Sequence, residues 1–147
     1  MLNDGEKFDK DRVNNLNPIV LAFIGDAVYS LYVREKLSLS CDSKTGELNK
    51  KTVAIVNAGA QSKLLNEILP ILTEEEIQIY KRGRNAKKGT HSKSASIKDY
   101  NNSTGFEALI GYLYLTGNIK RINEILNEGN NNEGWRQKFC LRVTKDR

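Results

Sequence analysis

Hydrophobic positions in this chain recur at the three- and four-residue spacing of helices, and the alternation expected of strands is almost absent. The most apolar stretch covers residues 19–36 (IVLAFIGDAVYSLYVREK) and is hydrophobic on nearly every side, which is typical of a buried central helix. Asn17 and Pro18 predict its start, because a capping asparagine precedes a proline at the first helical position. Charged side chains enter only in its last turns, at residues 34–36.

The remaining pattern predicts further helices, each bounded by residues that start or stop a helix. Two helices within residues 46–69 should meet near Ala58–Gly59, because glycine weakens a continuous helix. The TEEE sequence at residues 73–76 is a capping box that opens the next helix. The other expected helices are a short one near Phe8, one from about 97 to 116 stopped by Gly117, and one over 119–129 capped by Asn118. The predicted fold class is all-α.

A chain of 147 residues is long enough for one domain with its own core. We expect a polar N-terminal arm (1–16), a helical domain (17–129) and a tail (130–147) that the pattern leaves unassigned. No apolar run reaches the about 18 residues of a membrane span, and the N-terminus is too polar for a signal peptide. These features predict a cytoplasmic protein with no membrane partner. The two cysteines, Cys41 and Cys140, lack metal-type spacing and are expected to be thiols.

The net charge of +5 is concentrated in one segment. Residues 81–98 carry seven basic side chains and no acidic one, and without those seven the chain holds 16 basic and 18 acidic residues, a net charge of −2. Residues 83–95 lack periodicity, so we expect a functional loop there. A concentrated basic segment is typical of an element that contacts phosphates. The alternative is a lysine-rich loop that only faces solvent.

Two carboxylates occur where apolar residues are expected. Asp26 lies in the middle of the most apolar helix, and Glu107 lies in the second most apolar one. A buried carboxylate without a partner costs several kcal/mol, so each should have one. One acid alone could pair with a buried arginine or a tyrosine hydroxyl, but two on core helices favour a divalent-metal site. Gly25 and Gly111 would let the two helices approach closely, and oxygen ligands suit Mg²⁺, with Mn²⁺ as a substitute.

The residues around both acids resemble the two signatures of the ribonuclease III catalytic domain. One is LAFIGDAVYSLYVRE at residues 21–35, and the other is FEALIGYLYLTG at residues 106–117. The GDAVY form and the KRGRNAK sequence at 81–87 are most similar to the Mini-ribonuclease III branch. The resemblance extends over about residues 17–128. It implies a ribonuclease III-like helical endonuclease domain, with no double-stranded-RNA-binding domain after it.

The resemblance also implies an activity: a homodimeric, Mg²⁺-dependent endonuclease that cleaves double-stranded RNA, one strand at each subunit's site. By position, Asp26 and Glu107 are the signature acids, expected to be both catalytic residues and metal ligands. In the Mini branch the substrate is the precursor of the large-subunit (23S) ribosomal RNA, which makes a large-subunit ribosomal protein a candidate partner. This chain has Ala22 and Thr104 where larger ribonucleases III carry two more acids, which puts a tightly held metal pair in doubt.

A chain without a separate RNA-binding domain needs another surface for its substrate. An RNA duplex is recognised mainly through its shape, its 2′-hydroxyls and its phosphates. The basic segment is therefore expected to bind RNA, through the residues Arg82, Arg84, Asn85, Lys87 and Lys88.

Two other functions remain open at this stage. A catalytically inactive RNA-binding dimer could use the same basic segment, although it would gain nothing from two buried acids. A helical DNA-binding regulator is the third, less favoured interpretation, because no recognition helix with exposed basic or amide residues stands out in the sequence.

Overall fold

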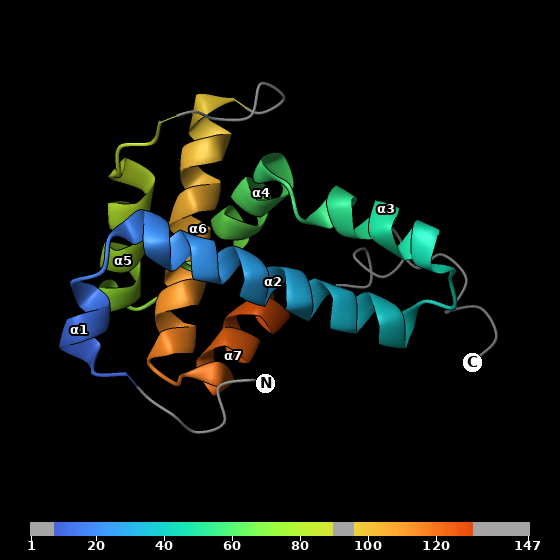
Figure 1. The fold of residues 1–147 in the computed structure, drawn as a ribbon, viewed down its shortest axis with the longest axis horizontal. Coiled ribbons are helices and arrows are strands. Elements are labelled where there is room, and N and C mark those ends of the chain that lie inside the picture. The colour runs from blue at the N-terminus through green and yellow to red at the C-terminus, as the bar shows by residue number, and fades with distance from the viewer. Residues whose placement is uncertain (1–7, 90–95, 131–147) are drawn as a thin grey trace.

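The computed structural model describes residues 8–89 and 96–130, and within those ranges every regular element is helical, as the sequence pattern predicts. No helix in those ranges is long and apolar enough to cross a membrane. Figure 1 shows the elements. They are α1 (Lys10–Asn14), α2 (Pro18–Ser40), α3 (Thr45–Ile55), α4 (Ala58–Ile68), the 3-10 turn η1 (Leu69–Ile71), α5 (Glu74–Asn85), α6 (Ile97–Leu115) and α7 (Ile119–Asn130).

The predicted helix ends are confirmed where a side chain or a glycine fixes them. The Asn17 side chain accepts a hydrogen bond of 2.9 Å from the backbone N–H of Ile19, at the start of α2. Thr73 and Glu76 make both bonds of the capping box at the start of α5. Gly117 has a φ of 76° just after α6, a backbone conformation that favours glycine.

The break between α3 and α4 lies where the pattern predicts it, but an asparagine makes it rather than Gly59. The Asn57 side chain accepts a hydrogen bond of 2.9 Å from the backbone N–H of Ala60, which caps α4. Its amide group also donates to the carbonyls of Val53 and Ala54, at the end of α3. One side chain therefore ends the first helix and begins the second.

Two helices run further than predicted. Helix α2 continues to Ser40 instead of ending near residue 36, because Leu37 is fully buried and holds the extra turn against the core. Helix α5 continues to Asn85, so the prediction of a loop from residue 83 is wrong for its first part. Gly83 does not break α5. A Cβ at this position would lie 2.8 Å from the Cβ of Ala108, so glycine there lets α5 pack closely on α6.

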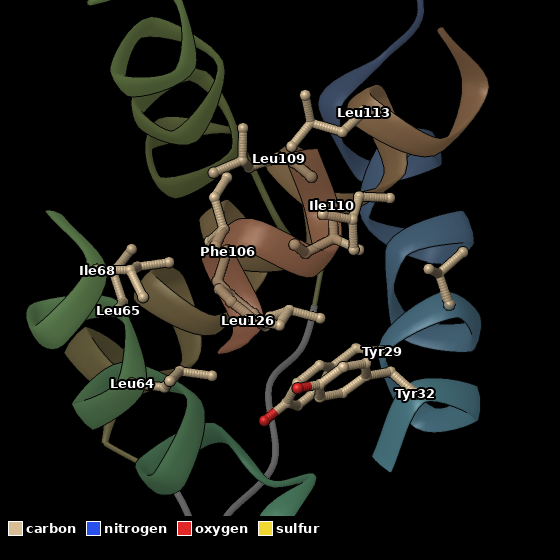
Figure 2. Close-up of a cluster of buried hydrophobic side chains, with 14 of the residues drawn as sticks. Tyr29, Tyr32, Leu64, Leu65, Ile68, Phe106, Leu109, Ile110, Leu113 and Leu126 are labelled. Carbon is tan, nitrogen blue, oxygen red and sulfur yellow. The ribbon is translucent and has the colours of Figure 1, made fainter. Parts of the chain in front are cut away.

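Helix α6 is the centre of the fold. Figure 1 shows α2 crossing it, with α4 and α5 on either side, and these three helices make its most extensive contacts. In the core, Tyr29 of α2 meets Phe106 of α6 edge to face, with ring centroids 5.0 Å apart. Figure 2 shows leucines and isoleucines of α4, α6 and α7 around these rings. The buried ring pair fixes α2 against α6.

A partly buried ion pair connects α5 to α7. Arg121 donates hydrogen bonds of 2.8 Å to both carboxylate oxygens of Glu76, and one of 2.7 Å to the carbonyl of Ile71. Burial alone would raise the pKa of Glu76, but the arginine together with the hydrogen bonds from Thr73 holds that pKa below its ordinary value. The pair therefore links the first turns of α5 and α7.

Three predictions concern residues at the edges of this fold. Within the N-terminal arm, α1 packs on the domain and buries Val13. The prediction that Cys41 is a thiol is wrong, since this residue is disulfide-bonded. Cys140 and the rest of the predicted tail from residue 131 lie outside the described residues.

Candidate active site

The site is built on the crossing of α2 and α6, where two glycines replace side chains. A Cβ at Gly25 would overlap the backbone carbonyl oxygen of Glu107, and a Cβ at Gly111 would overlap that of Leu21. The helix backbones therefore touch at the crossing, as the two glycines predict. This close approach places Asp26 of α2 beside Glu107 of α6.

The two predicted acids contact each other through their carboxyl groups. The pKa of Glu107 is raised to about 9, first by burial and then by the hydrogen bond and negative charge of Asp26. Glu107 is half-buried, whereas Asp26 is exposed, so the prediction that both acids are buried is wrong for Asp26. The reason is that one face of α2 is uncovered: next to Asp26, the side chain of Phe23 is 76% exposed.

An open cleft of about 430 Å³ lies over the two carboxyls. Ala22 and Thr104 line it beside Asp26 and Glu107. In the part of the chain that the structure describes, no group of three or more His, Cys, Asp or Glu side chains could hold a metal ion. The cleft thus offers two carboxylates as its anionic ligands.

The basic segment borders the same cleft, though not as the single loop that the sequence predicts. Arg82, Arg84 and Asn85 lie in the last turns of α5. Lys87 and Lys88 follow the helix and line the cleft that contains both acids. His91 and Lys93 lie outside the described residues.

The predicted RNA-binding side chains differ in their exposure and in the contacts that they make within the protein. Arg82 and Lys87 are exposed. The guanidinium of Arg84 lies over the ring of Tyr80, 5.4 Å from its centre, and donates a hydrogen bond of 3.0 Å to Asn85.

Lys88 is tied to the end of α5. Its ammonium donates hydrogen bonds of 2.8–3.0 Å to the carbonyls of Gly83, Arg84 and Ala86. An ammonium has three donors, so these bonds use all of them. Burial lowers the pKa of Lys88. Its direct role is therefore to cap the helix that carries the other basic residues.

Gln61 is a site residue that sequence reasoning missed. It lies on α4, is 3% exposed, and its Nε2 donates a long hydrogen bond of 3.5 Å to Oε2 of Glu107. A glutamine within AGAQSK, a sequence of small and polar residues, gives no pattern that marks it as buried.

The two acids fit a divalent cation. Two carboxyls in contact cannot both ionise without strong repulsion, which the raised pKa of Glu107 expresses. A cation between them would remove that repulsion, and hard oxygen ligands at an open cleft suit Mg²⁺ or Mn²⁺. Asp26 and Glu107 are the residues that would hold it.

Known proteins are similar to this chain over most of its length. Residues 19–118 match the Ribonuclease III domain family. The Mini-ribonuclease 3 of Clostridium tetani is 46% identical over 138 residues, which cover 88% of this chain and 91% of the relative. That of Brevibacillus brevis is 50% identical over 115 residues, 78% of this chain and 86% of the relative. A crystal structure of a protein from Fusobacterium nucleatum superposes with a TM-score of 0.70 at 35% identity, covering 77% of this chain and 90% of that one.

The raised pKa of Glu107 predicts how stability changes with pH when no metal is present. A carboxyl that binds its proton more tightly in the folded protein contributes stability that is complete below its ordinary pKa of 4.5 and is lost as the pH rises toward about 9. The variant Glu107→Gln has no ionisable group at this position, so it does not lose this stability as the pH rises. In EDTA, the melting temperature of the variant relative to the wild type should therefore rise between pH 5 and pH 8.5.

Glu67→Gln is the matched control, because Glu67 is an exposed glutamate on the surface of α4. It removes one negative charge without touching the cleft. A difference between Glu107→Gln and the wild type that stays constant from pH 5 to pH 8.5 would contradict the coupling of the two carboxyls.

Proposed function

Because the chain belongs to the ribonuclease III family, in its Mini-ribonuclease 3 branch, and is thus an endoribonuclease of double-stranded RNA, we propose that Asp26 and Glu107 perform this cleavage around a bound Mg²⁺. The observation that carries the proposal is the contact between the two carboxyls in a cleft bordered by Lys87 and Lys88. An acidic centre with a basic edge suits a phosphodiester, whose negative charge must be both attracted and neutralised.

Asp26 and Glu107 hold the cation, because their like charges face each other and one positive ion relieves the repulsion. When bound, the ion supplies a water of lowered pKa and neutralises charge at the phosphorus. The crossing of α2 and α6 fixes the backbones of both ligands, so the carboxylates are positioned before the substrate arrives.

The RNA duplex is held by the end of α5 and the segment after it. Arg82 and Lys87 are exposed and reach phosphates directly, whereas Arg84 and Asn85 present a paired guanidinium and amide beside them. Lys88 supports this surface by capping α5. Contacts of this kind follow the phosphate backbone and do not depend on the base sequence.

The active protein is a homodimer, as is typical of the family. Val20, Phe23 and Leu31 of α2 are 46%, 76% and 39% exposed and lie on the same helix as Asp26. A second copy on this face would cover the exposed apolar side chains and bring two sites to one duplex. The two strands can then be cut by two subunits.

The biological substrate is the 23S ribosomal RNA precursor, and the cell compartment is the cytoplasm. This part of the proposal rests on the resemblance of residues 81–87 and of the GDAVY sequence to the Mini branch. A large-subunit ribosomal protein is the partner that such a substrate implies, because the precursor is trimmed during ribosome assembly. A catalytically inactive RNA-binding dimer is disfavoured, since a binding protein gains nothing from two repelling carboxyls that face its anionic ligand.

Removing either acid should separate cleavage from binding. Asp26→Asn and Glu107→Gln keep the shape of the side chains but remove the charges that hold the cation. We expect folded variants that bind duplex RNA as tightly as the wild type and lose at least about a hundredfold of the cleavage rate, the loss typical of removing a group that stabilises the transition state. Gel-based cleavage with Mg²⁺ and gel-shift binding in EDTA measure the two properties.

The same assay distinguishes the alternative functions. A long RNA duplex, a DNA duplex and single-stranded RNA are each incubated with Mg²⁺ or with EDTA. Cleavage of the RNA duplex alone, and only with Mg²⁺, is the expected result. Near-normal turnover by Asp26→Asn would refute the assignment of the site, and binding without cleavage by the wild type would favour the inactive RNA-binding dimer.

The basic surface predicts a salt dependence. For duplex DNA, log K falls with log salt by about 0.9 per neutralised phosphate, and we expect a similar slope for RNA. Arg82→Ala with Lys87→Ala should therefore weaken binding to all RNA duplexes alike and reduce the slope by roughly two. Lys50→Ala with Lys120→Ala, which removes two exposed lysines from α3 and α7, is the control of equal charge. Equal slopes for the two double variants would show that the basic segment only faces solvent.

A further inference from the structure

Gln61 is a buried amide next to the candidate metal ligands. It projects from α4, which packs along α6, and only 3% of the residue is exposed. Burying a primary amide is costly unless it is hydrogen-bonded. Its Nε2 donates a hydrogen bond of 3.5 Å to Oε2 of Glu107.

The contact places a neutral donor on a carboxylate. An amide donates a hydrogen bond without adding charge, so it anchors the carboxylate and leaves the negative charge available to a cation. A carboxylate has two oxygens, and an anchor on Oε2 leaves the other for Asp26 and a cation.

We propose that Gln61 is a positioning residue: its amide holds the carboxylate of Glu107 in the orientation that binds the divalent cation. The inference rests on the proposed metal role of Glu107. Residues that orient metal ligands in this way typically contribute about 10- to 100-fold to metal affinity. Gln61 contacts neither the cation nor the RNA, and it acts only through Glu107.

A neighbouring hydrogen-bond network provides the control. Ser62, the next residue on α4, is also buried, and its hydroxyl accepts a bond of 3.1 Å from Asn102. Asn102 in turn accepts a bond of 3.1 Å from the hydroxyl of Tyr80. Ser62→Ala thus breaks a buried hydrogen bond between α4 and α6 and leaves the contact of Gln61 with Glu107 intact.

The test measures metal binding directly. Mn²⁺ is titrated into wild type, Gln61→Met and Ser62→Ala and followed by electron paramagnetic resonance, and the Mg²⁺ concentration for half-maximal cleavage is measured in parallel. Methionine keeps the length of the side chain and removes the donor. For Gln61→Met, we expect both the Mn²⁺ Kd and the required Mg²⁺ to rise on the order of tenfold, with kcat at saturating Mg²⁺ and duplex affinity in EDTA close to wild type.

The controls separate the possible outcomes. Ser62→Ala should bind Mn²⁺ like the wild type even where it lowers the melting temperature; an equal weakening in both variants would reduce Gln61 to a structural residue. Unchanged Mn²⁺ binding by folded Gln61→Met would overturn the inference. If the methionine variant does not fold, Gln61→Asn replaces it in the same titration, because asparagine keeps the amide but withdraws it by one methylene. Unchanged Mn²⁺ binding by Glu107→Gln would instead refute the proposed metal site itself.

Discussion

Helices α2 and α6 cross with their backbones in contact, and this crossing sets the positions of the other helices and of the two acids. Gly25 and Gly111 let the two backbones touch, and a side chain at either position would overlap a carbonyl of the facing helix. Because the backbones are this close, the carboxyls of Asp26 and Glu107 meet although 80 residues separate them in the chain. The core ring pair of Tyr29 and Phe106 lies on the same two helices and holds the crossing in place.

The crossing brings two carboxyls of like charge together, and their repulsion explains why the cleft suits a cation. Two facing carboxyls repel when ionised, and the burial of Glu107 makes that repulsion stronger. A fold selected only for stability would replace one of them. Here the repulsion is retained at an open cleft, next to cationic side chains that would attract a phosphate. The proposed cation would relieve this repulsion, so the site would give up some stability for its function, which is a common compromise.

Much of this arrangement can be predicted from the sequence, because the relevant signals are local. Asn17 and the Thr73–Glu76 capping box mark helix starts through hydrogen bonds within one turn. The two glycines and two acids stand out because each departs from an apolar pattern. The position of each along its helix is enough to predict that Asp26 and Glu107 lie near each other.

The sequence pattern misleads where contacts distant in sequence decide the outcome. Gly83 is typical of a helix end, but it allows α5 to pack on α6 and the helix continues past it. The apolar character of α2 on all sides predicts a buried Asp26, yet one face of α2 is exposed in the single chain. Gln61 and Lys88 are ordinary polar residues in the sequence, and only the packing of α4 on α6 and the end of α5 give them their roles.

The position of a bound cation would show whether Asp26 and Glu107 form a metal site. Crystals of the protein soaked in Mn²⁺ and measured at the manganese absorption edge locate the ion by its anomalous scattering. We expect a peak within coordination distance of carboxylate oxygens of both Asp26 and Glu107. Manganese bound elsewhere on the chain, with no peak between these two carboxylates at saturating concentration, would contradict it.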